Sequence, residues 1–116
     1  MIWKVSGDIP SIKNTLRRAK SGHFYHVNDS VAVYKRIFDL QTPKRFKVGI
    51  DGYVSVKVTL VRANKRKDPL NCIDTVADCL ENSGVIKNDR QIVCWEISAK
   101  EVNAKDPYVI IEVEEI

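Results

Sequence analysis

Alternating apolar and polar positions predict four β-strands in this chain. The clearest alternation is GYVSVKVTLVRA at residues 52–63, where every second position from Val54 to Arg62 shares one face. Successive side chains of a strand point to opposite faces of a sheet, so this valine-rich face is predicted to lie in the core. Three further strands are predicted, at residues 1–6, 92–102 and 107–116.

A helical repeat of apolar residues follows the clearest strand. Within residues 69–83 the apolar side chains recur at i, i+3, i+4 and i+7, beginning at Ile73, which is the spacing of one helix face. Asp68 followed by Pro69 suits an N-cap and a first helical position, and Gly84 suits a left-handed terminator. We therefore expect a half-buried helix bounded by these residues.

A second helix is predicted earlier in the chain, beginning at the cap Asn28 or Ser30 and carrying apolar residues to Leu40. Residues 8–30 combine Pro, Asn, Gly and basic residues with little periodicity, and we interpret most of them as a long basic loop, of a length that is usually functional. No internal repeat is present. We expect one α+β domain spanning residues 1–116, with two helices and a mixed, mainly antiparallel sheet.

Length and cysteine content indicate the class of protein. A chain of 116 residues can bury well over half of its unfolded surface without a disulfide or a metal. The three cysteines are an odd number without CxxC spacing, which indicates reduced thiols, and we interpret Cys72, Cys79 and Cys94 as core residues. No apolar stretch approaches the roughly 18 residues that cross a bilayer, and no secretion signal opens the chain, so we expect a cytoplasmic protein without membrane association.

Charge is distributed unevenly along the chain. Residues 1–67 hold fifteen Lys or Arg and four Asp or Glu, whereas residues 68–116 hold four and eleven. The first segment therefore carries a net charge of +11 and the second −7. This division favours a surface for a polyanion beside an acidic region able to hold divalent cations, and the alternative is solvated charge on two surfaces.

Residues 67–92, KDPLNCIDTVADCLENSGVIKNDRQI, resemble the motif of one known family. RusA-type Holliday junction resolvases, many of them from phages and prophages, share Asp-x-Asp-Asn, then a helix with Asp-Ala-Leu, a Gly, and finally Asp-Asp-x-Gln-Ile/Val. The residues in this register, without a gap, are Asp68, Asn71, Asp78, Leu80, Gly84, Asp89, Gln91 and Ile92. GDIPSIKN at residues 7–14 is similar to the family's early Pro-Pro-Ser-x-x-Asn. The resemblance covers most of the chain but is specific only between residues 66 and 92.

The resemblance implies a small homodimeric endonuclease that nicks four-way DNA junctions in recombination and repair, using Mg²⁺ or Mn²⁺. Carboxylates suit such an ion, because hard divalent cations prefer oxygen ligands and can activate water beside a phosphate. Asp68 and Asp89 flank a helix about 20 Å long, so we expect them to converge only if Asp89 returns on its following strand. Without the resemblance, a helix cap is the better explanation of Asp68, and an ordinary turn explains Asp89.

Two positions depart from the family pattern. Leu70 stands in place of the second acid of Asp-x-Asp, and Asp74 in place of the catalytic lysine four residues later. Leu70 and Asp74 are one turn apart, and helical side chains lean toward the N-terminus, so Asp74 can reach toward the place of the absent carboxylate. We predict Asp68, Asp74 and Asp89 as catalytic and metal-binding residues. The alternative is a catalytically impaired relative that still binds junctions.

Basic residues in two segments are the predicted contacts to DNA, because phosphate contacts need no base sequence to be read. They are Lys13, Asn14, Arg17, Arg18, Lys20, Lys65, Arg66 and Lys67. The charge of the absent lysine could come from Arg66, Lys67, Lys87 or Arg90. Any of these residues could equally be solvated charge, and Asp74 and Asp78 solvated helix surface. We interpret Asp78 as structural, and His23 and His26 as loop histidines, because zinc-ligand spacing is absent. A third alternative is an unrelated α+β scaffold whose basic loops recruit a protein.

Overall fold

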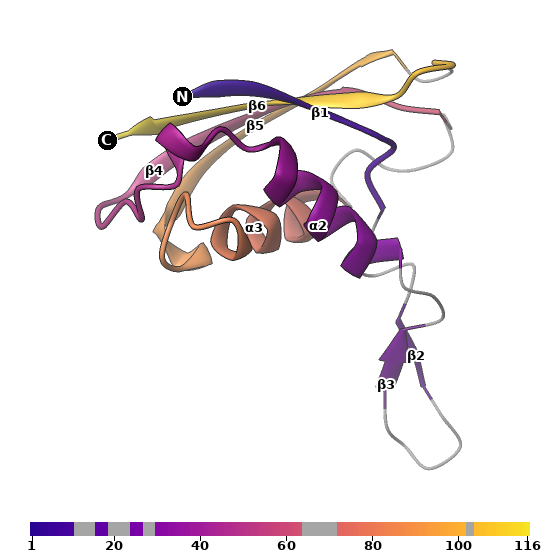
Figure 1. Ribbon diagram of the computed structural model, residues 1–116, viewed down its shortest axis with the longest axis horizontal. Coiled ribbons are helices and arrows are strands. Elements are labelled where there is room, and N and C mark those ends of the chain that lie inside the picture. Colours follow the sequence, from indigo (N-terminus) through magenta and orange to yellow (C-terminus); the bar gives the residue numbers. More distant parts are fainter. Residues whose placement is uncertain (11–15, 19–23, 27–29, 64–71, 102–103) are drawn as a thin grey trace.

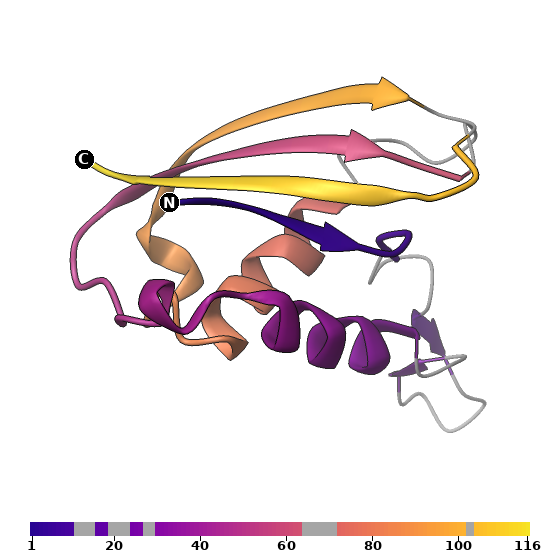
Figure 2. The same ribbon diagram turned by 45° about the horizontal axis from the view of Figure 1, so that its top comes forward.

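In the computed structural model, a four-stranded sheet is covered by two helices on one face (Figure 1, Figure 2). The structure describes residues 1–10, 16–18, 24–26, 30–63, 72–101 and 104–116, with the backbone alone for 16–18, 24–26 and 101. The elements in chain order are β1 (Ile2–Ser6), β2 (Leu16–Arg18), β3 (Phe24–His26), α2 (Ser30–Gln41), η1 (Lys44–Phe46), β4 (Val54–Val61), α3 (Ile73–Asn82), η3 (Asp89–Gln91), β5 (Ile92–Glu101) and β6 (Tyr108–Glu115). The expected α+β class is confirmed.

The sheet has the strand order β1-β6-β4-β5. Strand β6 runs antiparallel to both β1 and β4, and β4 runs parallel to β5. A parallel pair needs a long crossover connection, and α3 lies within the connection from β4 to β5. The predicted mixed, mainly antiparallel sheet is therefore confirmed.

The face of the sheet that meets the helices forms the core. The alternating residues of β4 that were predicted to be buried lie there, from Val54 to Leu60, both 0% exposed. Phe38 of α2 and Leu80 of α3 belong to the same buried cluster. Burying one such side chain stabilises the fold by about 1.5–3 kcal/mol, so the alternation of β4 determines which face the helices cover.

The opposite face of the sheet carries no helix among the described residues (Figure 2). Cys94 lies on this face, where it pairs in register with Ser55 of β4, and it is exposed. The interpretation of Cys94 as a core residue is wrong, because the β5 side chains that pack against the core are Ile92, Trp95 and Ile97. Cys72 and Cys79 are buried, as expected.

Two short strands lie within the segment that was predicted to be a basic loop. Strand β2 pairs antiparallel with β3, with Leu16 opposite His26. The pair stands apart from the four-stranded sheet (Figure 1). Strands of three residues are too short to show a hydrophobic alternation, so the sequence pattern did not indicate them.

Both long helices are close to their predicted positions. Helix α2 begins at Ser30, one of its two predicted starts, and α3 covers Ile73–Asn82. Gly84 has φ +82° and is the predicted left-handed residue after α3. The predicted N-cap Asp68 lies outside the described residues. No described helix is long and apolar enough to span a bilayer.

Candidate active site

Helix α3 runs antiparallel to β4, as hydrogen bonds at its two ends show. At the first turn of α3, the Thr75 hydroxyl donates to the Pro10 carbonyl at 2.8 Å. The neighbouring Ile9 carbonyl accepts from the guanidinium of Arg62 at 3.1 Å, and Arg62 directly follows β4. Beyond its last turn, the Gly49 amide donates to the Gly84 carbonyl at 2.8 Å, in the segment that precedes β4. The two ends of α3 therefore lie beside opposite ends of β4.

Asp74 lies in the first turn of α3. Its side chain is exposed and makes no ion pair among the described residues. An acidic side chain in the first turn lies at the positive end of the helix dipole, where it stabilises the helix. Asp74 is thus an exposed oxygen donor, unpaired within the described part of the chain, at the end of α3 that follows the motif residues 68–71.

Asp89 is the first residue of η3, directly before β5, and it is also exposed. A capping box holds this short helix. The Asn88 side chain accepts from the Arg90 amide at 2.9 Å, and the Gln91 side chain accepts from the Asn88 amide at 2.8 Å. The backbone at Asp89 is therefore fixed by its neighbours, while its carboxylate points to solvent.

The structure does not bring Asp74 and Asp89 together. They lie toward opposite ends of α3, whose ten residues span about 15 Å, and ligands of Mg²⁺ lie about 2 Å from the ion. Strand β5 starts beside the start of β4, and Asp89 precedes β5, so Asp89 lies at the end of α3 away from Asp74. The expected convergence of Asp89 with Asp68 stays a prediction. Asp68 and Leu70 lie outside the described residues, and the described residues hold no group of three His, Cys, Asp or Glu that could bind a metal.

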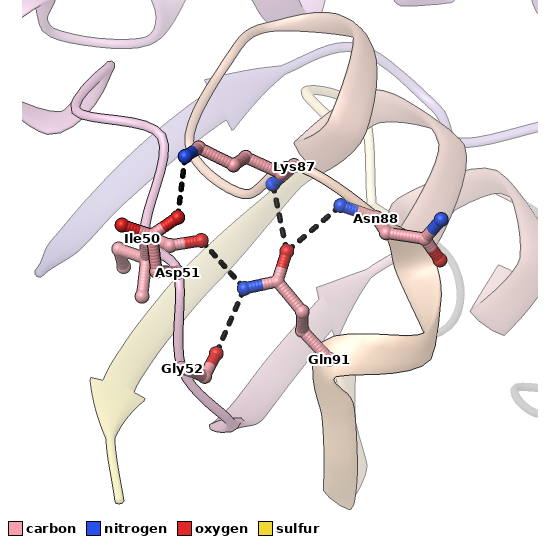
Figure 3. Close-up of polar contacts among 6 residues, drawn as sticks. All are labelled: Ile50, Asp51, Gly52, Lys87, Asn88 and Gln91. Atoms are coloured by element: carbon pink, nitrogen blue, oxygen red, sulfur yellow. Dashed lines mark hydrogen bonds and ion pairs between the residues drawn. The ribbon is translucent and has the colours of Figure 1, made fainter.

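The candidate replacements for the absent lysine differ in their surroundings. Lys87 forms an ion pair with Asp51 (Figure 3). Arg90 is exposed, and its guanidinium makes no ion pair within the described part of the chain. Arg66 and Lys67 lie outside the described residues. Of the two described candidates, Arg90 is the one available to a phosphate.

The predicted DNA contacts fall mostly outside the described residues. Arg17 and Arg18 belong to β2, for which the backbone alone is described, and β2 and β3 stand apart from the sheet (Figure 1). The predicted contacts outside the described residues are Lys13, Asn14, Lys20, Lys65, Arg66 and Lys67. Asp78 lies 3.7 Å from Lys35 of α2, which supports its interpretation as a structural residue.

Two residues near the candidate site have roles that the sequence did not indicate. Arg62 is 1% exposed, and its guanidinium holds the Ile9 carbonyl, which joins the GDIP segment to the end of β4. Gln91 is buried and bonds four backbone groups around η3. The only feature of the sequence that pointed to a special role of Arg62 was its charge at a position on the apolar face of a strand. For Gln91 the signal was its position in the family register.

The buried Cys79 is not a candidate nucleophile. Burial raises the pKa of its thiol from 9.0 to about 12, and the nearby Lys35 acts in the opposite direction. Burial likewise raises the pKa of Tyr34 above its usual value. Both groups are neutral near pH 7, so neither supplies a nucleophile to the candidate site.

A comparison with protein families gives one match, to Endodeoxyribonuclease RusA over residues 8–114. No curated protein matches the chain. The match begins at Asp8, after β1, and covers both long helices and three of the four strands of the sheet, with β6 matched to Glu114. It overturns the alternative of an unrelated scaffold. RusA proteins are endodeoxyribonucleases that resolve Holliday junctions. The chain belongs to the RusA endodeoxyribonuclease family.

Proposed function

We propose that this chain resolves four-way DNA junctions in recombination and repair by metal-dependent hydrolysis of phosphodiester bonds. The observation that carries the proposal is the RusA match over residues 8–114. The exposed carboxylates of Asp74 and Asp89 support it, because oxygen donors at the surface suit Mg²⁺ or Mn²⁺. With Asp68, they form the proposed catalytic and metal-binding set.

The positions of Asp74 and Asp89 favour a site shared between two copies of the chain. A two-fold axis can place the Asp74 end of α3 in one copy against Asp89 of a second copy, and the reciprocal contact then forms an identical second site. Two sites related in this way match the symmetry of a four-way junction, whose resolution needs one nick in each of two strands. We therefore propose a homodimer in which Asp68 and Asp74 of one copy meet Asp89 of the other.

Each group of residues has a separate role in this proposal. When bound, the metal ion supplies an activated water and offsets charge at the scissile phosphate. The carboxylates of Asp68, Asp74 and Asp89 hold it. Arg90, next to Asp89 and without an ion pair among the described residues, is placed to contact the phosphate. The predicted basic residues of both loops bind the DNA backbone.

A nicking assay with a labelled four-way junction tests the proposal. We expect the parent protein to nick in Mg²⁺ or Mn²⁺ and not in EDTA, and Asp89→Asn to bind junctions normally without nicking, because it removes a ligand but no phosphate contact. Glu81→Gln is the matched control, since Glu81 is an exposed acid of α3 that lies outside the proposed site. Full nicking by Asp89→Asn would remove Asp89 from the site.

A second function is favoured by the departures at Leu70 and Asp74. Loss of both family residues would leave a relative that binds junctions but does not cut them. Junction binding in EDTA, combined with no nicking in either metal, would establish this second function. Nicking by the parent excludes it.

A further inference from the structure

The side chain of Gln91 is a buried connection between η3 and the segment that precedes β4 (Figure 3). Its Oε1 accepts from the amides of Lys87 and Asn88, both at 2.8 Å. Its Nε2 donates to the carbonyls of Ile50, at 2.5 Å, and Gly52, at 2.8 Å. A glutamine carboxamide has two N–H donors and two acceptor lone pairs, so Gln91 uses its full capacity.

Hydrogen bonds hold the backbone on both sides of Asp89. Before Asp89, the amides of Lys87 and Asn88 are held by Gln91. After it, the Ile92 amide donates to the carbonyl of Asp89 itself. The exposed carboxylate of Asp89 is therefore carried by a short helix whose backbone is hydrogen-bonded at both ends.

The segment bonded by Gln91 is itself attached to the core. Ile50 is buried, its amide donates to the Val85 carbonyl at 3.0 Å, and it forms a parallel bridge with Ile86. The exposed ion pair between Asp51 and Lys87 spans the same junction (Figure 3). Gln91 therefore connects η3, which begins with Asp89, to a segment that is itself attached to the core.

We propose that Gln91 is the positioning residue for Asp89, holding its carboxylate where it can bind the catalytic metal. The inference rests on the proposed function of Asp89. Metal ligands must be held within about 0.5 Å of the productive geometry, and loss of a group that orients a ligand typically reduces metal affinity or activity by about 10–100-fold. Gln91 does not contact the metal or the DNA; it acts through Asp89.

The variant Gln91→Glu tests the connection with the smallest change of shape. It retains the two acceptor bonds from Lys87 and Asn88 but loses both donors, and it places a carboxylate against the carbonyls of Ile50 and Gly52. Gln41→Glu is the matched control. The Gln41 side chain also accepts from a backbone amide and donates to a backbone carbonyl, both of Ser6, but it joins α2 to β1, away from η3.

Three measurements on the full-length protein separate positioning from folding. Circular dichroism reports the folded fraction, electron paramagnetic resonance of free Mn²⁺ reports metal affinity without DNA, and single-turnover nicking reports activity. We expect Gln91→Glu to be folded at 25 °C, to bind junctions in EDTA like the parent, and to lose about tenfold or more in both Mn²⁺ affinity and nicking rate. Gln41→Glu should match the parent in all three. A folded Gln91→Glu with parental Mn²⁺ affinity and nicking rate overturns the inference.

If Gln91→Glu does not fold, Gln91→Met replaces it, because methionine has a similar length and brings no charge into the buried site. A folded Gln91→Met with parental Mn²⁺ affinity also overturns the inference. Failure of the proposed function gives a different result: the parent protein itself neither binds Mn²⁺ nor nicks junctions. Failure of the positioning role alone leaves the parent active and the Gln91 variants equal to it.

Discussion

At the scale of single residues, Asp74 is the proposed substitute for the acid that the family motif has at position 70. It stands where the family has a lysine, and it is exposed in the first turn of α3 without an ion pair among the described residues. The family motif has an acid where this chain has Leu70, four residues before Asp74 in the sequence. Asp74 is therefore the residue on which the proposed set of three carboxylates depends.

We predict that Asp74→Asn reduces nicking by about 100-fold or more, because loss of a direct ligand should cost at least as much as loss of a group that orients one. Its stability should change by less than about 1 kcal/mol, the usual size of a helix-dipole interaction. Adding Leu70→Asp should partly restore nicking by returning a carboxylate to the family position. Equal nicking by Asp74→Asn and the parent would show that Asp74 is solvated helix surface.

The buried thiol of Cys79 gives a prediction about alkaline pH. Its pKa is near 9 when unfolded and about 12 when folded, so its contribution to stability is complete below pH 9 and is lost as the pH rises from 9 toward 12. From pH 9 to 10.5 this loss amounts to about 1.5 kcal/mol. Guanidinium unfolding at both pH values measures it. In Cys79→Ala the pH-dependent loss should shrink by that amount, and an unchanged loss would contradict the prediction.

The sequence patterns predicted which side chains are buried better than they predicted which residues those side chains contact. The alternation in β4 correctly placed Arg62 on the buried face, but only the fold shows why a charge is tolerated there, since its guanidinium bonds the Ile9 carbonyl from a distant segment. Cys94 was misplaced because a thiol suits either face, and the register of β5 against Ser55 decides which one it takes. Such contacts between distant segments have no local signal.

At the scale of elements, Gly84 shows how a helix end follows from one residue. Its φ of +82° is a conformation that residues with a Cβ adopt only with strain, and a Cβ added there would meet no atom closer than the Lys47 Cβ at 4.0 Å. Any cost of a side chain at this position therefore comes from the backbone conformation. A substitution at Gly84 therefore tests the left-handed backbone conformation without adding a steric clash.

We predict that Gly84→Ala lowers the free energy of unfolding by about 1–2 kcal/mol. Gly52→Ala is the control, because φ at Gly52 is not positive and a Cβ there has no atom within 4 Å. Its effect should stay within about 0.5 kcal/mol. Urea unfolding of both variants is the measurement. Equal stability of the two variants would mean that the left-handed turn after α3 is not strained by a side chain.

The elements with long periodic patterns were predicted and the short ones were not. Strands of β4's length and helices of ten or more residues repeat their pattern often enough to be identified, as α3 shows. The three-residue strands β2 and β3, and the single turn η3, contain no full period. Their formation depends on pairing and on bonds such as those of Gln91, which are made with other segments.

At the scale of the whole molecule, the motif predicted which residues belong together but not where they lie. Asp89 was expected to return on the strand that follows it. The parallel pairing of β4 with β5 starts β5 beside the start of β4, so Asp89 lies toward the end of α3 opposite to Asp74. Asp68, toward which Asp89 was expected to return, lies outside the described residues, so that convergence stays a prediction. Strand order depends on the packing of all four strands, which no local spacing records.

Mixing two inactive variants tests whether the site is shared between copies. In a shared site, Asp68 and Asp74 of one copy work with Asp89 of the other. A mixed dimer of Asp68→Asn and Asp89→Asn then has one site with both substitutions and one site with neither. We predict that each variant alone fails to nick, whereas the mixture regains nicking. Each mixed dimer then has one intact site, which is about half of the number in the parent dimer.

The same mixture gives the opposite result if all three carboxylates come from one copy. Each copy then carries one substitution in its own site, both sites of the mixed dimer are damaged, and no nicking returns. In the shared-site arrangement, by contrast, a mixed dimer has one intact site and should cut only one strand of a junction, so the product is a nicked junction and not two separated duplexes. As the control, each variant alone is taken through the same mixing procedure. Recovery of single nicks in the mixture would therefore establish both the dimer and the exchange of Asp89 between its copies.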